Sequence, residues 1–380
     1  MKHTRLLKGR LNMNQKSIIT LSIMGALLAS NVSAANKVAD ARGNAMGNTG
    51  VASADYLTAP FYNPALTASY KDEDDFGVFL GLEISANDQN DAISAIDDLQ
   101  DNINDNNQSA INQSLNELDG IEPVQVNTGI GLAIALPTEF VASNLFVHSY
   151  AEIVATTDIT NDYQTSTVDL VAFGYVELGL ALAKQFQISG ERFSFGITPK
   201  YQQMTTYAQV ATVENFDVDD YDENETTKSA FNVDLGAVWY KEDFRVALAV
   251  KDLIAQEINV SNNQGNINGT YNLDTQVTVG IAYDIDYFVA AIDADLSKQT
   301  RFENIDTNDD TQFIRFGIEG NAWGWAQLRA GYEIDLEETL DNSITAGIGI
   351  SPFDLVSLDI AGSYAGTNQL GVSTNVAFTF

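Results

Sequence analysis

The side chains that most often perform catalysis are scarce in this sequence. Its 380 residues include no cysteine and two histidines, and one of these, His3, lies in a stretch that we expect to be removed. His148 is then the sole imidazole, too few for a histidine-based zinc site, and no thiolate exists. No Gly-x-Ser-x-Gly elbow presents a nucleophilic serine. We therefore predict no enzyme activity, no metal ion and no cofactor.

Charged side chains at strand spacing are the more informative set. Residues two apart in a strand lie on the same face of a sheet, and a charge facing lipid costs roughly 2–4 kcal/mol at the bilayer midplane. We therefore expect ten charged residues to face a barrel interior: Asp234, Arg245, Lys251, Asp293, Asp295, Arg315, Glu319, Arg329, Glu333 and Asp359. Two interpretations remain open. The set is either a polar pathway or, as we favour, a network of cross-strand ion pairs that braces the wall and seats an internal segment.

The stretch Thr212–Ser229 is a strongly acidic loop. Oxygen ligands at this density could hold Ca²⁺ loosely, but the loop lacks the turn glycine and the ligand spacing of an EF-hand. We favour a solvated acidic loop that divalent ions link to lipopolysaccharide.

Alternation of apolar residues with small or polar ones runs through most of the chain after residue 76. Val124–Leu136 is the clearest case, with valine, isoleucine and leucine on one face and glycine, alanine and amides on the other. We count fourteen such segments, and Phe244–Val260 and Tyr271–Tyr283 predict one strand each. Short connections alternate with longer, more acidic ones, as in outer-membrane barrels. The sequence predicts an all-β fold: a transmembrane antiparallel β-barrel of about 14 strands.

Two aromatic features fit a barrel in a bacterial outer membrane. Aromatic side chains that we place on the outer face, such as Trp239, Phe313 and Tyr332, would form girdles at the lipid headgroups. The core of a soluble β-sandwich is the alternative. The last strand ends on Phe378 and Phe380, which resembles the C-terminal signal by which the barrel-assembly machinery recognises outer-membrane barrels.

The insertion 85–120 departs from the alternation. Its apolar residues recur at helical spacing, and Asn, Asp and Gln fill the other face. We predict two short amphipathic helices, broken near Asn104–Asn107, in the first extracellular loop.

The first 34 residues have the features of an export signal. Basic residues precede the apolar run Ile18–Leu28, and Val32-Ser33-Ala34 supplies a small-x-small cleavage pattern. Cleavage after Ala34 removes five basic residues and no acidic one, so the formal net charge moves from −33 to −38. This acidity argues against nucleic acid as a partner, because a phosphate backbone would be repelled.

Residues 35–70 are rich in glycine and small residues, which allow close backbone contacts. The stretch Ala41–Ala52 and the turn Asn63-Pro64-Ala65 resemble the N-terminal hatch of FadL-type outer-membrane barrels, and within that superfamily the branch of conjugal-transfer TraF-like proteins. The resemblance implies a hatch of residues 35–70 inside a barrel of residues 71–380. It also implies a role in setting the hatch conformation, as a gate, for Arg42, Gly43, Asn63, Pro64 and Ala65. A tight plug turn without a gating role is the alternative.

The resemblance carries two hypotheses about function. The first is a passive uptake channel for small hydrophobic molecules such as long-chain fatty acids. The second is a non-transporting outer-membrane scaffold that binds partner proteins of a conjugation or secretion system. A continuous apolar cavity past the hatch would favour the channel, whereas a filled interior would suit a scaffold.

Overall fold

The computed structural model of the chain describes residues 38–380, except 72, 89, 217–223, 264, 306, 308, 323, 353–354 and 367–368. The predicted export signal 1–34 and the middle of the acidic loop 212–229 therefore lie outside the described residues. Among the helices described, none is long and apolar enough to cross a membrane.

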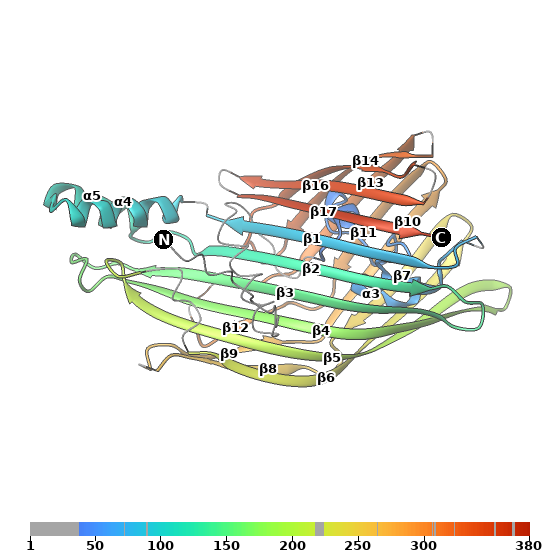
Figure 1. Cartoon of the computed structure of the whole chain (residues 1–380), viewed down its shortest axis with the longest axis horizontal. Coiled ribbons are helices and arrows are strands. Elements are labelled where there is room, and N and C mark those ends of the chain that lie inside the picture. Colours follow the sequence, from blue (N-terminus) through green and yellow to red (C-terminus); the bar gives the residue numbers. More distant parts are fainter. Residues whose placement is uncertain are drawn as a thin grey trace, which may run out of the picture.

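Fourteen antiparallel strands close into a barrel, which confirms the predicted fold class (Figure 1). Each wall strand pairs with the next one along the chain, and β1 closes the ring by pairing with β17. The wall strands are β1 (Gly77–Asn87), β2 (Val124–Leu136), β3 (Ala142–Asp158), β4 (Thr167–Ile188), β5 (Glu191–Thr212), β6 (Thr226–Lys241), β7 (Phe244–Lys251), β10 (Gln276–Ile285), β11 (Phe288–Asp295), β13 (Phe313–Ala322), β14 (Ala326–Asp335), β15 (Ser343–Ile350), β16 (Val356–Gly366) and β17 (Gln369–Thr379).

The period-two pattern explains why this wall forms. Leu80 of β1 lies opposite Leu132 of β2, and both side chains are exposed on the outer face, where a membrane would cover them. Phe79, one residue earlier, is buried inside. The same pattern corrects one prediction. Phe313 points inward and is buried, because it shares the phase of the inward-facing Arg315 two residues later.

The two ends of the barrel differ in their connections. Turns such as Ser189–Gly190 and Glu242–Asp243 are short and lie at one end, which we call the short-turn rim. The chain end lies at this rim, where the Phe380 backbone exchanges hydrogen bonds with Phe76 just before β1 (Figure 1). The opposite end, the long-loop rim, carries the longer connections. In outer-membrane barrels the short turns face the periplasm.

Two helices follow β1 at the long-loop rim, as predicted. α4 (Ala92–Asn104) and α5 (Gln108–Leu118) break within the predicted stretch Asn104–Asn107. Leu99 and Leu115 pack in one apolar cluster with Val168 of β4. The hairpin therefore stands beside the longest wall strands and extends beyond the rim (Figure 1).

A second, smaller sheet corrects the predicted limits of two strands. An internal three-stranded sheet has the order β12-β9-β8: β8 (Gln256–Ser261), β9 (Asn268–Leu273) and β12 (Phe302–Glu303). β8 and most of β9 were not expected here: β8 takes the end of the predicted strand Phe244–Val260, and β9 takes the start of the predicted strand Tyr271–Tyr283. β12 lies in a stretch predicted as a loop. Ile258 and Tyr271 pack against Phe173 and Met204 on the inner face of the wall. Alternation did not reveal this, because an internal sheet with one apolar face has the same period as a wall strand.

The N-terminal segment lies inside the barrel as short helices: α2 (Ala41–Ala45), α3 (Ala59–Tyr62) and the 3₁₀ helix η1 (Pro64–Ala68) (Figure 1). α2 packs against β14–β17, and η1 packs against β3–β6. We call residues 38–70 the hatch. Nearly all of its side chains are buried, so the hatch acts as the core around which the wall closes.

Candidate functional site

Inward-facing glycines of the wall support the hatch. A Cβ added at any of seven of these glycines would lie within 2.5 Å of a hatch atom. We call this set the glycine seat: Gly77, Gly81, Gly196, Gly236, Gly317, Gly331 and Gly347. Gly196 lies directly opposite Gly236, and Gly317 lies opposite Gly331. Adjacent strands therefore both lack a side chain at the same level of the wall. Only glycine allows the hatch backbone to approach the wall this closely.

Polar wall side chains hold the hatch backbone around the ring. The Asp293 carboxylate accepts hydrogen bonds from the amides of Gly50 and Val51 at 2.7 and 2.9 Å. Asn144, on the other side of the barrel, donates to the carbonyls of Tyr56 and Leu57. Further contacts come from Lys251 to the Phe61 carbonyl, Ser194 to the Ala65 carbonyl, and Asn375 to the Ala41 amide. The hatch is therefore bound to strands on every side.

Eight of the ten predicted charged residues form ion pairs in the interior. The Arg329 guanidinium lies 2.6 Å from Glu319 and 2.5 Å from Asp359, and Arg42 of the hatch joins Glu319 at 2.9 Å. Arg315 pairs at 2.9 Å with both Asp295 and Glu333. Of the others, Asp234 pairs with Lys200, and Arg245 with Asp284 near the short-turn rim. Asp293 and Lys251 contact hatch backbone instead.

One buried ionic cluster was not predicted from the sequence. Lys200 places its ammonium 3.2, 3.0 and 2.8 Å from Glu177, Asp234 and Asp252, and all four side chains are buried. His148 lies 3.4 Å from the same Glu177. The signal was present, because Lys200 shares the inward phase of Thr198 and Gln202 in β5. One cation among three carboxylates acts as their common counter-charge.

The predicted gate residues occupy two separate places. Arg42 and Gly43 lie in α2, where a Cβ on Gly43 would overlap the Tyr62 hydroxyl. The turn Asn63-Pro64-Ala65 lies over β5 and β6, and the Asn63 side chain caps η1 by accepting from the Ala65 amide while donating to the Val51 carbonyl. The structure therefore joins the turn to the middle of the hatch. Phe378 and Phe380 are exposed at the short-turn rim.

A chain of aromatic rings leads from the hatch toward the long-loop rim. Phe61 of the hatch lies 5.9 Å from Phe79, 5.5 Å from Phe146 and 5.5 Å from His148, measured between ring centroids. His148 continues to Tyr175 at 5.5 Å and Tyr175 to Phe173 at 6.0 Å. Phe173 stacks on Tyr271 of the internal sheet at 3.5 Å, and Tyr271 meets Phe302. We call these residues the aromatic track.

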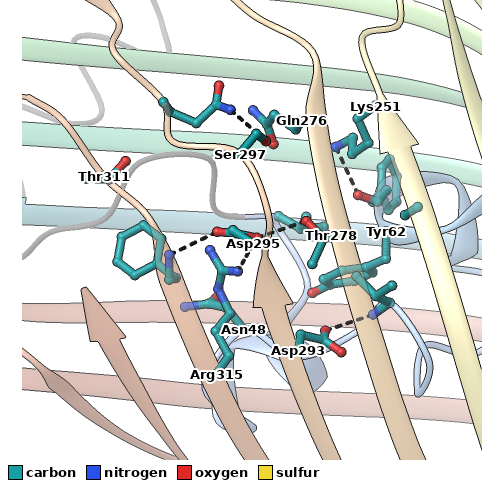
Figure 2. Close-up of a pocket in the computed structure, with 16 residues that line it drawn as sticks. Asn48, Tyr62, Lys251, Gln276, Thr278, Asp293, Asp295, Ser297, Thr311 and Arg315 are labelled. Atoms are coloured by element: carbon teal, nitrogen blue, oxygen red, sulfur yellow. Dashed lines mark hydrogen bonds and ion pairs between the residues drawn. The ribbon is translucent and has the colours of Figure 1, made fainter. Parts of the chain in front are cut away.

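A polar cavity of about 70 Å³ lies on the other side of the barrel, between the hatch and strands β7, β10, β11 and β13. Figure 2 shows Asp295 between Arg315 and Thr278, with Asp293 nearer the hatch. An apolar cavity that binds benzene has a volume of about 150 Å³, so this one is too small for a hydrocarbon ligand. Within the described parts of the chain, no group of three or more His, Cys, Asp or Glu side chains is placed to hold a metal ion.

Asp40 gives the hatch a measurable pH dependence. Its carboxylate accepts from the amides of Arg42 and Gly43 at the start of α2, and burial, with the nearby Asp55 carboxylate, raises its pKa from 3.8 to about 6. The seated hatch therefore binds this proton more tightly than the unfolded chain does. The contribution of Asp40 to the stability of the folded protein is complete below about pH 4 and is lost as the pH rises through about 6.

We expect the melting temperature of the wild type to rise relative to that of Asp40→Asn as the pH falls from about 7 to about 5. Asn keeps an oxygen acceptor for the cap and cannot titrate, so the difference between the two profiles isolates Asp40. Parallel profiles over this range would contradict the assignment.

The chain matches the family model described as "F plasmid transfer operon, TraF, protein" over residues 60–295. None of the curated proteins matches it. Among solved structures it is similar to the Ralstonia pickettii toluene transporter TbuX, at 12% identity and a TM-score of 0.59, over 91% of this chain and 99% of that chain.

Two further structures show the same likeness. The TodX deltaS2S3 mutant monoaromatic hydrocarbon channel has 12% identity and a TM-score of 0.55, over 89% of this chain and 98% of that one. A Pseudomonas aeruginosa FadL homologue has 10% identity and a TM-score of 0.51, over 93% and 100%. At these identities the likeness shows the fold, which is that of FadL-type outer-membrane barrels.

Proposed function

Because the chain belongs to the TraF family of the F plasmid transfer operon and has the fold of a FadL-type outer-membrane barrel, we propose that it is a hatch-closed channel for small hydrophobic molecules. The structures it resembles include a toluene transporter and a monoaromatic hydrocarbon channel. The interior supports a related ligand class for this chain through one observation, the aromatic track.

The aromatic track offers a hydrophobic solute a continuous series of ring contacts. It begins at the internal sheet near the long-loop rim and ends at Phe61 of the hatch. A solute moving along it would exchange one ring contact for the next, each worth about 1 kcal/mol. The rings pack against each other in this structure, so passage requires them and the hatch to move apart. A filled interior would also suit a scaffold, so in this proposal the structure corresponds to the closed state of the channel.

The gate in this proposal is the hatch, held by Arg42 and the turn Asn63-Pro64-Ala65. Arg42 links α2 to Glu319 of the wall and also donates to the Ser53 carbonyl at 2.6 Å. The Asn63 side chain links the turn to the Val51 carbonyl. Release of Arg42 and Asn63 from these partners would free the hatch between them, residues 43–62, which includes Phe61 at the end of the aromatic track.

The aromatic track can be tested by removing one ring at a time. We expect Phe173→Leu, which keeps an apolar side chain but loses the stack on Tyr271, to weaken binding of oleate to the purified protein by roughly fivefold, the equivalent of about 1 kcal/mol. Calorimetric titration in detergent measures this. Phe316→Leu, on the outer face, is the matched control and should bind like the wild type.

Failure of the wild type to bind oleate or toluene, together with unchanged uptake in a deletion strain, would count against the channel. Equal affinity of Phe173→Leu and wild type would place the ligand elsewhere.

A scaffold in a conjugation system is the second candidate function, and the helical hairpin favours it. α4 and α5 expose a polar face outside the barrel, with Asp97, Asp98 and Glu117 in solvent. Such a face suits contact with a partner protein at the cell surface. Replacing residues 92–118 by a short linker should lower mating frequency if this face carries the function, while oleate binding stays unchanged. Normal mating by that variant and by a deletion strain would remove this candidate.

A further inference from the structure

The hatch separates two polar cavities that lie along the same part of the wall. The cavity of about 70 Å³ described above faces the long-loop rim and is lined by Thr278, Asp293 and Asp295. A larger cavity, of about 590 Å³, opens at the short-turn rim and is lined by Arg42, Asp284 and Glu319. We call it the vestibule. Strands β10, β11 and β13 border both cavities.

The barrier between the two cavities is one segment of the hatch, and several of its residues are small. Along β11, Asp293 in the cavity and Val289 in the vestibule are four positions apart, or about 14 Å at the usual rise of a strand. The hatch residues against this stretch are Met46 to Ser53, and they include Thr49, Gly50 and Ala52. The wall residues of the aromatic track lie on β1, β3 and β4, across the barrel, and Phe61 at its hatch end also lines the 70 Å³ cavity.

Polar atoms without a protein partner mark this barrier. One carboxylate oxygen of Asp293, Oδ2, accepts hydrogen bonds from the amides of Gly50 and Val51. The other oxygen, Oδ1, is buried with no hydrogen-bond partner in the protein. The hydroxyl of Ser53 is likewise buried and unpaired. An unpaired buried polar group costs roughly 1–3 kcal/mol, and water is the usual partner in such places. A volume of about 70 Å³ has room for about two water molecules.

We infer that this side of the barrel is a second, water-filled route that carries small hydrated cations past the hatch along β10, β11 and β13, whereas the wall residues of the aromatic track belong to β1, β3 and β4. Acidic and basic side chains line both cavities in similar numbers, so the lining tolerates ions of either sign. The formal net charge of −33 then gives cations the advantage, because the field of the whole protein raises their concentration at the two mouths.

The route runs from Thr278 and Asp293, past the backbone at Gly50, to Ser53 and Glu319. The Arg42 guanidinium crosses this route, from Glu319 to the Ser53 carbonyl. Movement of the segment Met46–Ser53 away from β11 and β13 would join the two cavities.

The absence of cysteine from the chain permits a direct test. Ser53→Cys, in the barrier, should react with a cationic methanethiosulfonate reagent in the folded protein, and the reaction should reduce K⁺ current in planar bilayers. Ala133→Cys is the matched control, because Ala133 is equally buried and inward-facing but packs with the apolar residues of the hatch. It should not react. Under a KCl gradient, wild-type current should favour K⁺, and Asp293→Asn should move the reversal potential toward zero.

Modification of Ser53→Cys with loss of current supports the route. A wild-type barrel that carries no K⁺ current, with Ser53→Cys unreactive while folded, would overturn it. Heat-modifiable migration in gels shows for each variant that the barrel is folded. Oleate binding is expected to be unchanged in Ser53→Cys, which keeps this result independent of the hydrophobic channel.

Discussion

Gly331→Ala is expected to unseat the hatch while leaving the barrel closed. The added Cβ would lie 2.0 Å from the Gly47 amide nitrogen and 2.3 Å from the Met46 carbonyl carbon. Both are backbone atoms, so no side chain can rotate away. Such overpacking costs roughly 1–3 kcal/mol, and the strain is relieved if the hatch moves off the wall.

Trypsin measures this displacement. The bond after Arg42 lies in α2, buried between hatch and wall, and should resist cleavage in the wild type. In Gly331→Ala we expect that cleavage to be roughly tenfold faster, the equivalent of about 1.4 kcal/mol. Gly320→Ala is the control, because Gly320 lies in the adjacent strand with nothing within 4 Å of an added Cβ. Equal cleavage of the two variants would show that the glycine seat does not hold the hatch.

Lys200→Met is expected to be the most destabilising single change in the wall. It leaves Glu177, Asp234 and Asp252 buried without their shared cation. Breaking a buried ion pair by removing one partner costs roughly 3–5 kcal/mol. The temperature at which the barrel loses its fast gel migration should therefore fall by several degrees.

Two further variants test the cause of that loss. Lys241→Met removes an exposed lysine that pairs with Glu191 at the short-turn rim, and it should have little effect because exposed pairs contribute at most about 1 kcal/mol. Adding Asp234→Asn to Lys200→Met removes one uncompensated charge and should restore part of the lost stability. A double variant less stable than Lys200→Met would show that the lysine does not act as a counter-charge.

The wall of this protein could be predicted from its sequence because lipid and interior impose opposite demands on alternate residues. That rule placed Asp295, Arg315 and Glu333 inside, where they pair. The same rule predicts that Phe313 faces inward, because it shares the phase of Arg315. Phe313 was placed outward instead because aromatic residues were expected in the girdles, so the error came from the residue type and not from the alternation.

The interior was harder to predict because its contacts join residues far apart in the sequence. The glycine seat is visible only once strand register places Gly317 opposite Gly331, and Gly196 opposite Gly236, beneath the hatch. The internal sheet has the same alternation as a wall strand. Lys200 gave a phase signal, yet its partner Asp252 has the outward phase of the predicted strand Phe244–Val260. Asp252 turns inward because β7 ends at Lys251 and the alternation stops there. Register and loop geometry, rather than period, determine these contacts.

The central claim is that hydrophobic molecules pass this barrel only when the hatch moves, and a single tether tests it. A Cβ at Gly129 would lie 3.5 Å from the Cβ of Ala39 at the start of the hatch, close to the separation of a disulfide, about 3.5–4.5 Å. In proteoliposomes, Ala39→Cys/Gly129→Cys should take up oleate when reduced and lose that uptake when oxidised. The single-cysteine variants should be indifferent to oxidant. Equal uptake by the oxidised and reduced double variant would contradict the account.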